Sequence, residues 1–167
     1  MLVVALLLAT TQPGAAQLAA DQHWPQFRGP AGRAIADGAE LPDSEQVAWF
    51  QPSGMPDVPS PLVYRGRLYS IFDNGILNVF DTYTGQRVYR KRVGGGGSGF
   101  SASPWAADGK VYLLSEEGDT FVIAAGDSYE ELAVNGLDEL AFASPAVADG
   151  ALFIRTMTKL YRIEAMP

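Results

Sequence analysis

Residues 60–69 read Ser-Pro-Leu-Val-Tyr-Arg-Gly-Arg-Leu-Tyr, and the same arrangement returns twice further along the chain. In each copy the Gly lies six residues after the Ser and opens a short apolar run that ends in an aromatic residue. The Ser-Pro pairs begin at Ser60, Ser103 and Ser144, so successive copies are 43 and 41 residues apart. A period in the low forties, built from short strands and turns, is typical of the blades of a β-propeller. The repeat glycines and the closing aromatic residues are Gly66 and Tyr69, Gly109 and Tyr112, and Gly150 and Phe153.

Each complete copy predicts four strands, the first of which carries the Ser-Pro pair, because proline has no amide for the strand ladder and suits a strand start. The other strands are expected at 67–72, 76–81 and 86–92 in the first copy, and at 110–115, 119–124 and 129–134 in the second. The third strand of the first copy is followed by a turn in which Asp81 is expected to accept backbone amides and Gly85 to take the left-handed conformation. Because a repeat is a packing unit, the three closing aromatic residues are expected to share one burial environment.

The third copy stops early, after strands expected at 151–156 and 159–164. It lacks a fourth strand, whereas an unassigned strand-like segment, residues 46–50 with Trp49, precedes the first copy. Because a bare strand edge invites pairing, we expect this segment to complete the last sheet. The predicted fold is therefore all-β, a partial β-propeller of three four-stranded antiparallel blades, with an N-terminal strand completing the last blade. The blades are expected at about residues 60–93, 102–135 and 143–165, plus the strand 46–50.

Three blades are too few to close a ring, which needs at least about four. Apolar sheet faces should then be exposed or covered by another molecule. We therefore expect the chain to bind a protein partner or to associate with itself.

The first twenty residues, 1–20, have the composition of a secretory signal peptide. Residues 1–9 are almost entirely Leu, Val and Ala, too short a run to span a bilayer, and small residues precede a cleavage point near Gln17. A positively charged start is missing, and a wrongly assigned start is the alternative. A periplasmic or secreted protein without a stable membrane span is expected.

Residues 21–44 predict an extended arm, because they are rich in Gln, Ala, Gly, Pro and Asp and have no sustained period. Within it lies a motif of aromatic and turn-forming residues that includes Trp24, Phe27 and Arg28. Large aromatic side chains favour an apolar contact, so Trp24 and Phe27 are expected to dock the arm on a blade. A role in stacking on a ligand is the alternative.

The composition excludes several functional classes. A net charge of −7 provides no basic stripe for nucleic acid. The absence of Cys and the presence of a single His, His23, leave no disulfide, no zinc site and no Ser/His/Asp triad. The side chains of Asp73 and Asn74, and of Glu116, Glu117 and Asp119, are interpreted as parts of solvated hairpin turns rather than as calcium ligands. No catalytic, cofactor-binding or metal-binding residue is predicted.

Residues 94–100, Gly-Gly-Gly-Gly-Ser-Gly-Phe, superficially resemble a phosphate-binding loop. Such a loop joins a strand to the start of a helix, and no helical pattern follows here. The segment instead predicts a flexible loop between two blades, at a rim where peptides or ligands could bind.

Taken together, the Ser-Pro pair, the Gly-x-Leu/Val-Tyr run and the Asp-x-x-Thr-Gly turn at 81–85 resemble the PQQ-like β-propeller repeat. This repeat occurs in quinoprotein alcohol dehydrogenases and in the outer-membrane assembly propeller lipoprotein, and the resemblance covers about residues 22–165. The arm at 24–30 is similar to the start of exported proteins that carry the repeat. Because related propellers have about seven or eight blades, the chain resembles their front end joined to their last three blades.

The resemblance leaves two functions open. The alcohol-dehydrogenase branch would imply PQQ and calcium, together with an adjacent-cysteine disulfide, a Trp beneath the quinone, calcium-binding carboxylates and a catalytic Asp. The chain has no Cys, and Trp105 has no companion motif, so no residue is assigned to a cofactor. We therefore expect a non-catalytic binding or scaffold propeller of the cell envelope, which holds a protein or other partner through blade faces and rim loops. A remnant of a PQQ-dependent quinoprotein dehydrogenase is the alternative.

Overall fold

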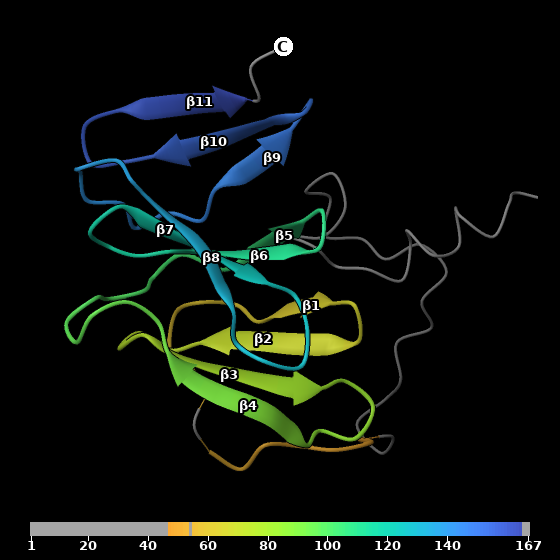
Figure 1. Cartoon of the computed structure of the whole chain (residues 1–167). Helices are drawn as coiled ribbons and strands as arrows, with labels where there is room; N and C mark the ends of the chain where they lie inside the picture. The colour runs from red at the N-terminus through yellow and green to blue at the C-terminus, as the bar shows by residue number, and fades with distance from the viewer. Residues whose placement is uncertain (1–46, 54, 165–167) are drawn as a thin grey trace, which may run out of the picture.

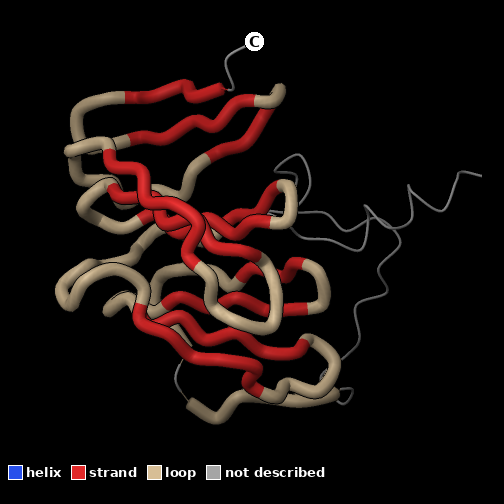
Figure 2. The backbone as a smooth tube through the Cα atoms, viewed as in Figure 1, coloured by secondary structure: helices blue, strands red, loops and turns tan. Residues whose placement is uncertain are grey.

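The computed structural model describes residues 47–53 and 55–164, and this part of the chain contains strands and loops but no helix (Figures 1 and 2). The strands form three antiparallel sheets, each in chain order. The first sheet contains β1 (Leu62–Tyr64), β2 (Arg67–Ile71), β3 (Ile76–Asp81) and β4 (Arg87–Arg92). The second contains β5 (Trp105–Ala107), β6 (Lys110–Leu114), β7 (Asp119–Ala124) and β8 (Glu131–Gly136). The third contains β9 (Ala146–Ala148), β10 (Ala151–Arg155) and β11 (Leu160–Glu164).

The three sheets lie one above another, with the first in yellow and green at the bottom of Figure 1 and the third in blue at the top. This arrangement confirms the predicted all-β partial propeller. The bounds of β3 and β7 agree with the predicted strands. β8 begins two residues later than predicted, and its register with β7 shifts between Val122 and Ile123, where a bulge displaces the pairing.

The repeat glycine has a conformational origin. β1 and β2 are joined by two residues, Arg65 and Gly66, with φ values of 51° and 72°. The same two-residue turn joins β5 to β6 and β9 to β10, where an Asp with positive φ precedes Gly109 or Gly150. Two consecutive positive φ angles define the hairpin turn whose twist matches that of the flanking strands, and Gly takes the second position without steric cost.

The closing aromatic residues occupy one position in each sheet but differ in burial. Tyr69 pairs with the first residue of β1, and Tyr112 and Phe153 pair with the first residues of β5 and β9. Tyr69 is fully buried, whereas Tyr112 and Phe153 are half-buried. The expectation of equal burial is therefore wrong. Tyr69 packs against the second sheet, while no described sheet lies beyond Phe153.

Two clusters of buried side chains hold the sheets together. The larger one lies between the first and second sheets and includes Tyr69, Ile71, Phe100, Val111 and Ile123. The smaller one joins the second and third sheets. Its members are Ala102, Trp105, Leu114, Ala141 and Ile154.

The predicted N-terminal strand does not complete the third sheet, which has three strands in the described part of the chain. Residues 47–50 form no strand. The Trp49 indole Nε1–H instead donates to the Thr82 carbonyl oxygen at 2.9 Å, and the Gln51 amide donates to the Gly85 carbonyl oxygen at 2.8 Å. The segment therefore docks on the β3–β4 turn of the first sheet, where the Thr82 carbonyl accepts the Trp49 indole and the Gly85 carbonyl accepts the Gln51 side chain.

Within the described ranges no helix is long and apolar enough to cross a membrane. The predicted signal peptide at 1–20 and the arm with Trp24, Phe27 and Arg28 lie outside the described residues.

Candidate functional site

The serine of each Ser-Pro pair links one sheet to the next. The Ser60 backbone amide donates to the Ser103 hydroxyl at 2.9 Å, and the Ser103 amide donates to the Ser144 hydroxyl at 2.8 Å. We call these two bonds the serine chain. Ser103 is buried, so water cannot easily replace its hydroxyl as the acceptor of the half-buried Ser60 amide. The motif that defines the repeat therefore has a structural role at the junctions.

The Asp81 turn also has a structural role. One carboxylate oxygen of Asp81 accepts the backbone amides of Tyr83 and Thr84, at 3.0 and 2.9 Å. The other is 2.8 Å from Arg67, whose guanidinium also contacts Asp127 of the second sheet at 2.7 Å. The Thr84 amide makes the largest contribution to lowering the pKa of Asp81, and the Arg67 hydrogen bond lowers the pKa of Asp127. The Asp81 pair lies within the first sheet, and the Asp127 pair links the first sheet to the second.

Gly85 closes this turn with a φ of 68°. A Cβ at this position would lie 2.6 Å from the Trp49 ring, so a glycine is required both for the backbone conformation and for the contact with Trp49.

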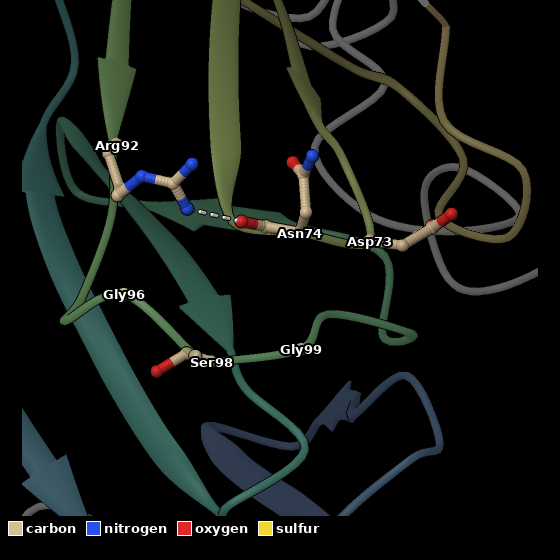
Figure 3. A pocket seen from close by; sticks show the side chains of 7 residues that line it. Asp73, Asn74, Arg92, Gly96, Ser98 and Gly99 are labelled. Atoms are coloured by element: carbon tan, nitrogen blue, oxygen red, sulfur yellow. Dashed lines mark hydrogen bonds between the residues drawn. The ribbon is translucent and has the colours of Figure 1, made fainter.

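The glycine-rich loop after β4 borders an open hollow of about 520 Å³ (Figure 3). Arg92 provides the positive charge there, and its guanidinium donates to the Asn74 carbonyl oxygen at 2.7 Å. Figure 3 shows the side chains of Asp73 and Ser98 pointing in different directions, so the polar groups do not converge on one point. The hollow is bordered by a loop between two sheets. Its polar groups do not converge on one point, as they would in a phosphate-binding site.

The third sheet presents a different kind of surface. Its outer strand, β11, has a neighbour on one side in the part of the chain that the structure describes. Leu152 packs toward the second sheet, so by strand alternation Phe153 faces the other way, together with Leu160, which pairs with Arg155. Leu160 is 72% exposed. We call the outer edge of β11, with Phe153 and Leu160, the β11 surface.

Neither a protein-family model nor a curated protein sequence matches the chain. Among solved structures, the chain is similar to BamB from Moraxella catarrhalis, with 17% identity and a TM-score of 0.50. This match covers 62% of the chain and 32% of BamB, so the chain spans about a third of that protein. It is also similar to the quinohemoprotein alcohol dehydrogenase from Comamonas testosteroni, with 19% identity, a TM-score of 0.48, and coverage of 60% of this chain and 17% of that one. A europium-containing methanol dehydrogenase matches at 16% identity and a TM-score of 0.49, over 65% of this chain and 22% of that one.

At these identities the likeness shows the fold alone. The fold is that of a β-propeller, of which the described residues form three sheets. The resemblance inferred from the repeat is confirmed at this level.

Trp105, the tryptophan of the second sheet, is buried and stacked on Tyr112, with ring centroids 5.3 Å apart and an interplanar angle of 11°. Its ring therefore packs between two sheets. In residues 47–53 and 55–164, no group of three or more His, Cys, Asp or Glu side chains is placed to hold a metal ion.

The sequence located the repeat positions but not the β11 surface. Gly66, Gly109 and Gly150 lie at hairpin turns. The sequence signal for the β11 surface was the short third copy, which predicted a strand edge without a partner. Residues 46–50 were expected to pair with that edge.

Proposed function

We propose that the chain is a non-catalytic binding module of the cell envelope, which holds a protein partner by adding one β-strand of that partner to the third sheet. The observation that supports this is the outer edge of β11, which pairs with no further strand among the described residues, whereas the first and second sheets have four strands each. In strand addition, backbone hydrogen bonds supply affinity and alternate side chains supply specificity. The envelope location rests on the composition of residues 1–20.

The register indicates which groups a partner strand would meet. The Thr156 amide donates to the Lys159 carbonyl oxygen at 2.9 Å, and hydrogen-bonded pairs alternate along an antiparallel ladder. The backbone amides of Leu160 and Arg162 therefore point toward the outer edge. Leu160 supplies an apolar contact on the same surface, and an exposed edge with apolar side chains is a template for another strand.

Site-specific photo-cross-linking in the native cell tests this proposal. A photo-reactive amino acid is placed at position 160 or 162, and at position 84 in the first sheet as an exposed control. We expect cross-links from 160 and 162 to neighbouring positions of one segment of a single protein, and none of that protein from 84. A cross-link to another copy of the chain would mean that the edge binds a second copy and not a different protein. The absence of edge-specific cross-links would overturn the proposal.

A matched pair of variants tests the strand geometry. Arg162→Pro removes the outward amide while leaving the inward ladder bonds in place, since proline is tolerated at a strand edge. Arg162→Ala removes only the side chain. We expect Arg162→Pro to abolish cross-linking from position 160, and Arg162→Ala to preserve it. Light scattering during size-exclusion chromatography then shows whether the isolated chain is a monomer.

A further inference from the structure

A hollow of about 430 Å³ lies between the second and third sheets, on the opposite face of the third sheet from Phe153 and Leu160. The second sheet contributes Trp105, Ala107, Asp108 and Tyr112 to its walls, and the third sheet contributes Leu152 and Ile163. Mostly apolar concave spaces of roughly 300–1,000 Å³ are the usual size of small-molecule sites. We call this space the inter-sheet groove.

The repeat shows what fills the same place between the first and second sheets. Ala107 ends β5 at the position where Tyr64 ends β1. The Tyr64 ring packs against the buried cluster between those sheets, and its hydroxyl accepts the Gly109 backbone amide at 3.0 Å. In the third sheet, Gly150 takes the place of Gly109. The groove therefore has the walls of a site for a phenol ring, and an alanine where the ring would be attached.

The larger neighbouring residue does not replace the missing ring. Trp105 stands at the position of Leu62, but its indole lies nearly parallel to the Tyr112 ring, with centroids 5.3 Å apart. The two rings form one wall of the groove. Because they are stacked on each other, the space beside Ala107 stays open.

The charge at the rim is reversed between the two junctions. At the first junction Arg65 follows Tyr64 and its guanidinium lies over the Tyr64 ring, 5.3 Å from the centroid. At the second, Asp108 holds the position of Arg65. The pKa of Tyr112 is raised by burial and then by the Asp108 charge, which indicates that this carboxylate lies near the groove.

A second acidic residue contributes less to the rim. Glu164 also lines the groove, but its carboxylate is paired with Arg162 at 2.5 Å. Asp108 is therefore the carboxylate that would select the charge of a ligand.

We infer that the inter-sheet groove binds a small cationic phenol, an arylalkylamine whose ring occupies the place of the Tyr64 side chain and whose ammonium group lies beside Asp108. The phenol hydroxyl accepts the Gly150 amide, as the Tyr64 hydroxyl accepts the Gly109 amide. The stacked Trp105 and Tyr112 rings and Leu152 enclose the aromatic part.

Tyramine is the probe for this site, with 4-methylphenol as the neutral analogue and 3-(4-hydroxyphenyl)propionate as the anionic one. Amide NMR of the full chain should show tyramine shifting the signals of Gly150 and the Trp105 indole, with a dissociation constant on the order of 0.1–1 mM. The anionic analogue should bind about tenfold more weakly than tyramine, because its carboxylate faces Asp108. Equal binding of the three probes, or no shift at several millimolar, would overturn the inference.

Two variants at the groove separate shape from charge. Ala107→Tyr supplies the ring from the chain itself and should weaken tyramine binding more than about tenfold, while Ala107→Ser should leave it unchanged. Asp108→Asn should weaken tyramine about fivefold and leave 4-methylphenol unaffected. Tyramine binding that survives Ala107→Tyr in a folded chain contradicts the assigned place of the ring.

The first junction supplies a matched control that does not depend on the second. Tyr64→Ala should open a corresponding hollow beside Arg65. In this variant the anionic analogue should bind at the first junction in preference to tyramine, and the Gly109 amide should report it. A failure here would show that the missing ring alone does not create a site. None of these measurements involves the β11 surface, so they stand apart from the proposed strand addition.

Discussion

The junction between the first and second sheets and the junction between the second and third use corresponding backbone bonds but different side chains. The Phe100 amide donates to the Asp73 carbonyl oxygen, and the Ala141 amide donates to the Glu116 carbonyl oxygen, both at 2.9 Å. Phe100 and Ala141 are both fully buried, yet one is a large aromatic residue and the other a methyl group. The same backbone bond therefore joins both pairs of sheets, although the buried side chains beside it differ greatly in volume.

The largest expected effect comes from removing the buried aromatic ring at each junction. Tyr69→Ala should lower the free energy of unfolding by about 3–5 kcal/mol, because Tyr69 is fully buried between two sheets. Tyr112→Ala should cost about half as much, since Tyr112 is half-buried beside the inter-sheet groove. Urea unfolding followed by circular dichroism measures both. Equal losses would contradict the difference in packing.

The serine chain offers a comparison of hydrogen bonds at the same two junctions. Ser103→Ala leaves the half-buried Ser60 amide without its acceptor and should cost about 1–3 kcal/mol, because Ser103 is buried and water cannot easily replace its hydroxyl. Ser144→Ala acts on the Ser103 amide and should cost less, because Ser144 is only half-buried and water can replace its hydroxyl. The exposed Ser128→Ala is the control and should change stability by less than about 0.5 kcal/mol.

Two glycines test whether the segment before the first sheet stabilises it. Gly85→Ala combines an unfavourable φ with a contact to the Trp49 ring, and should cost about 2 kcal/mol. Gly66 has a similar φ and open space around it, so Gly66→Ala should cost about 1 kcal/mol. If Trp49→Ala removes the difference between the two glycine variants in thermal unfolding, the docking of residues 47–50 accounts for it. A difference that persists without the indole would mean that the contact has no energetic role.

The smallest expected effect is on stability at acid pH. It compares one carboxylate at the first junction with one at the second. Asp127 binds Arg67 across the first junction, and its pKa is lowered chiefly by that bond. Glu139 accepts the hydroxyls of Thr156 and Thr158, and the Thr156 bond is the main cause of its lowered pKa. A lowered folded-state pKa gives stability that is present above the unfolded-state pKa, near 4, and is lost as the pH falls through the folded value.

Asp127→Asn and Glu139→Gln should therefore lower the melting temperature at pH 7 and flatten its decrease between about pH 5 and 3. Melting curves across this pH range measure the effect. If the melting temperature of either variant fell with pH as steeply as that of the unmodified chain, that carboxylate would not stabilise its junction.

The repeat made most of the fold predictable. The segments that depart from the repeat were difficult to predict. Hairpin glycines and the Asp81 turn are local signals, so the bounds of β3 and β7 could be predicted from residues alone. The position of Trp49 could not, because the strand-like residues around it predicted a strand, whereas the hydrogen bond to the Thr82 carbonyl and the contact with Gly85 depend on tertiary structure.

The candidate sites show the same division. Alignment of the copies shows that Ala107 occupies the position equivalent to Tyr64. Which side chains face a neighbouring sheet becomes clear only from the strand register. The bare edge of β11 was predictable from the short third copy, while the failure of residues 46–50 to cover it was not.

The serine chain gives the stack of sheets a direction. Each link runs from the amide of one copy to the hydroxyl of the copy that follows it in the chain. A duplicated copy joined in the same reading direction would meet a donor on one side and an acceptor on the other, so the array can lengthen or shorten by whole repeats without a mismatch. A copy docked in the reverse orientation would bring two amide donors together at one junction. One serine hydroxyl per repeat therefore determines in which orientation the next repeat can be joined.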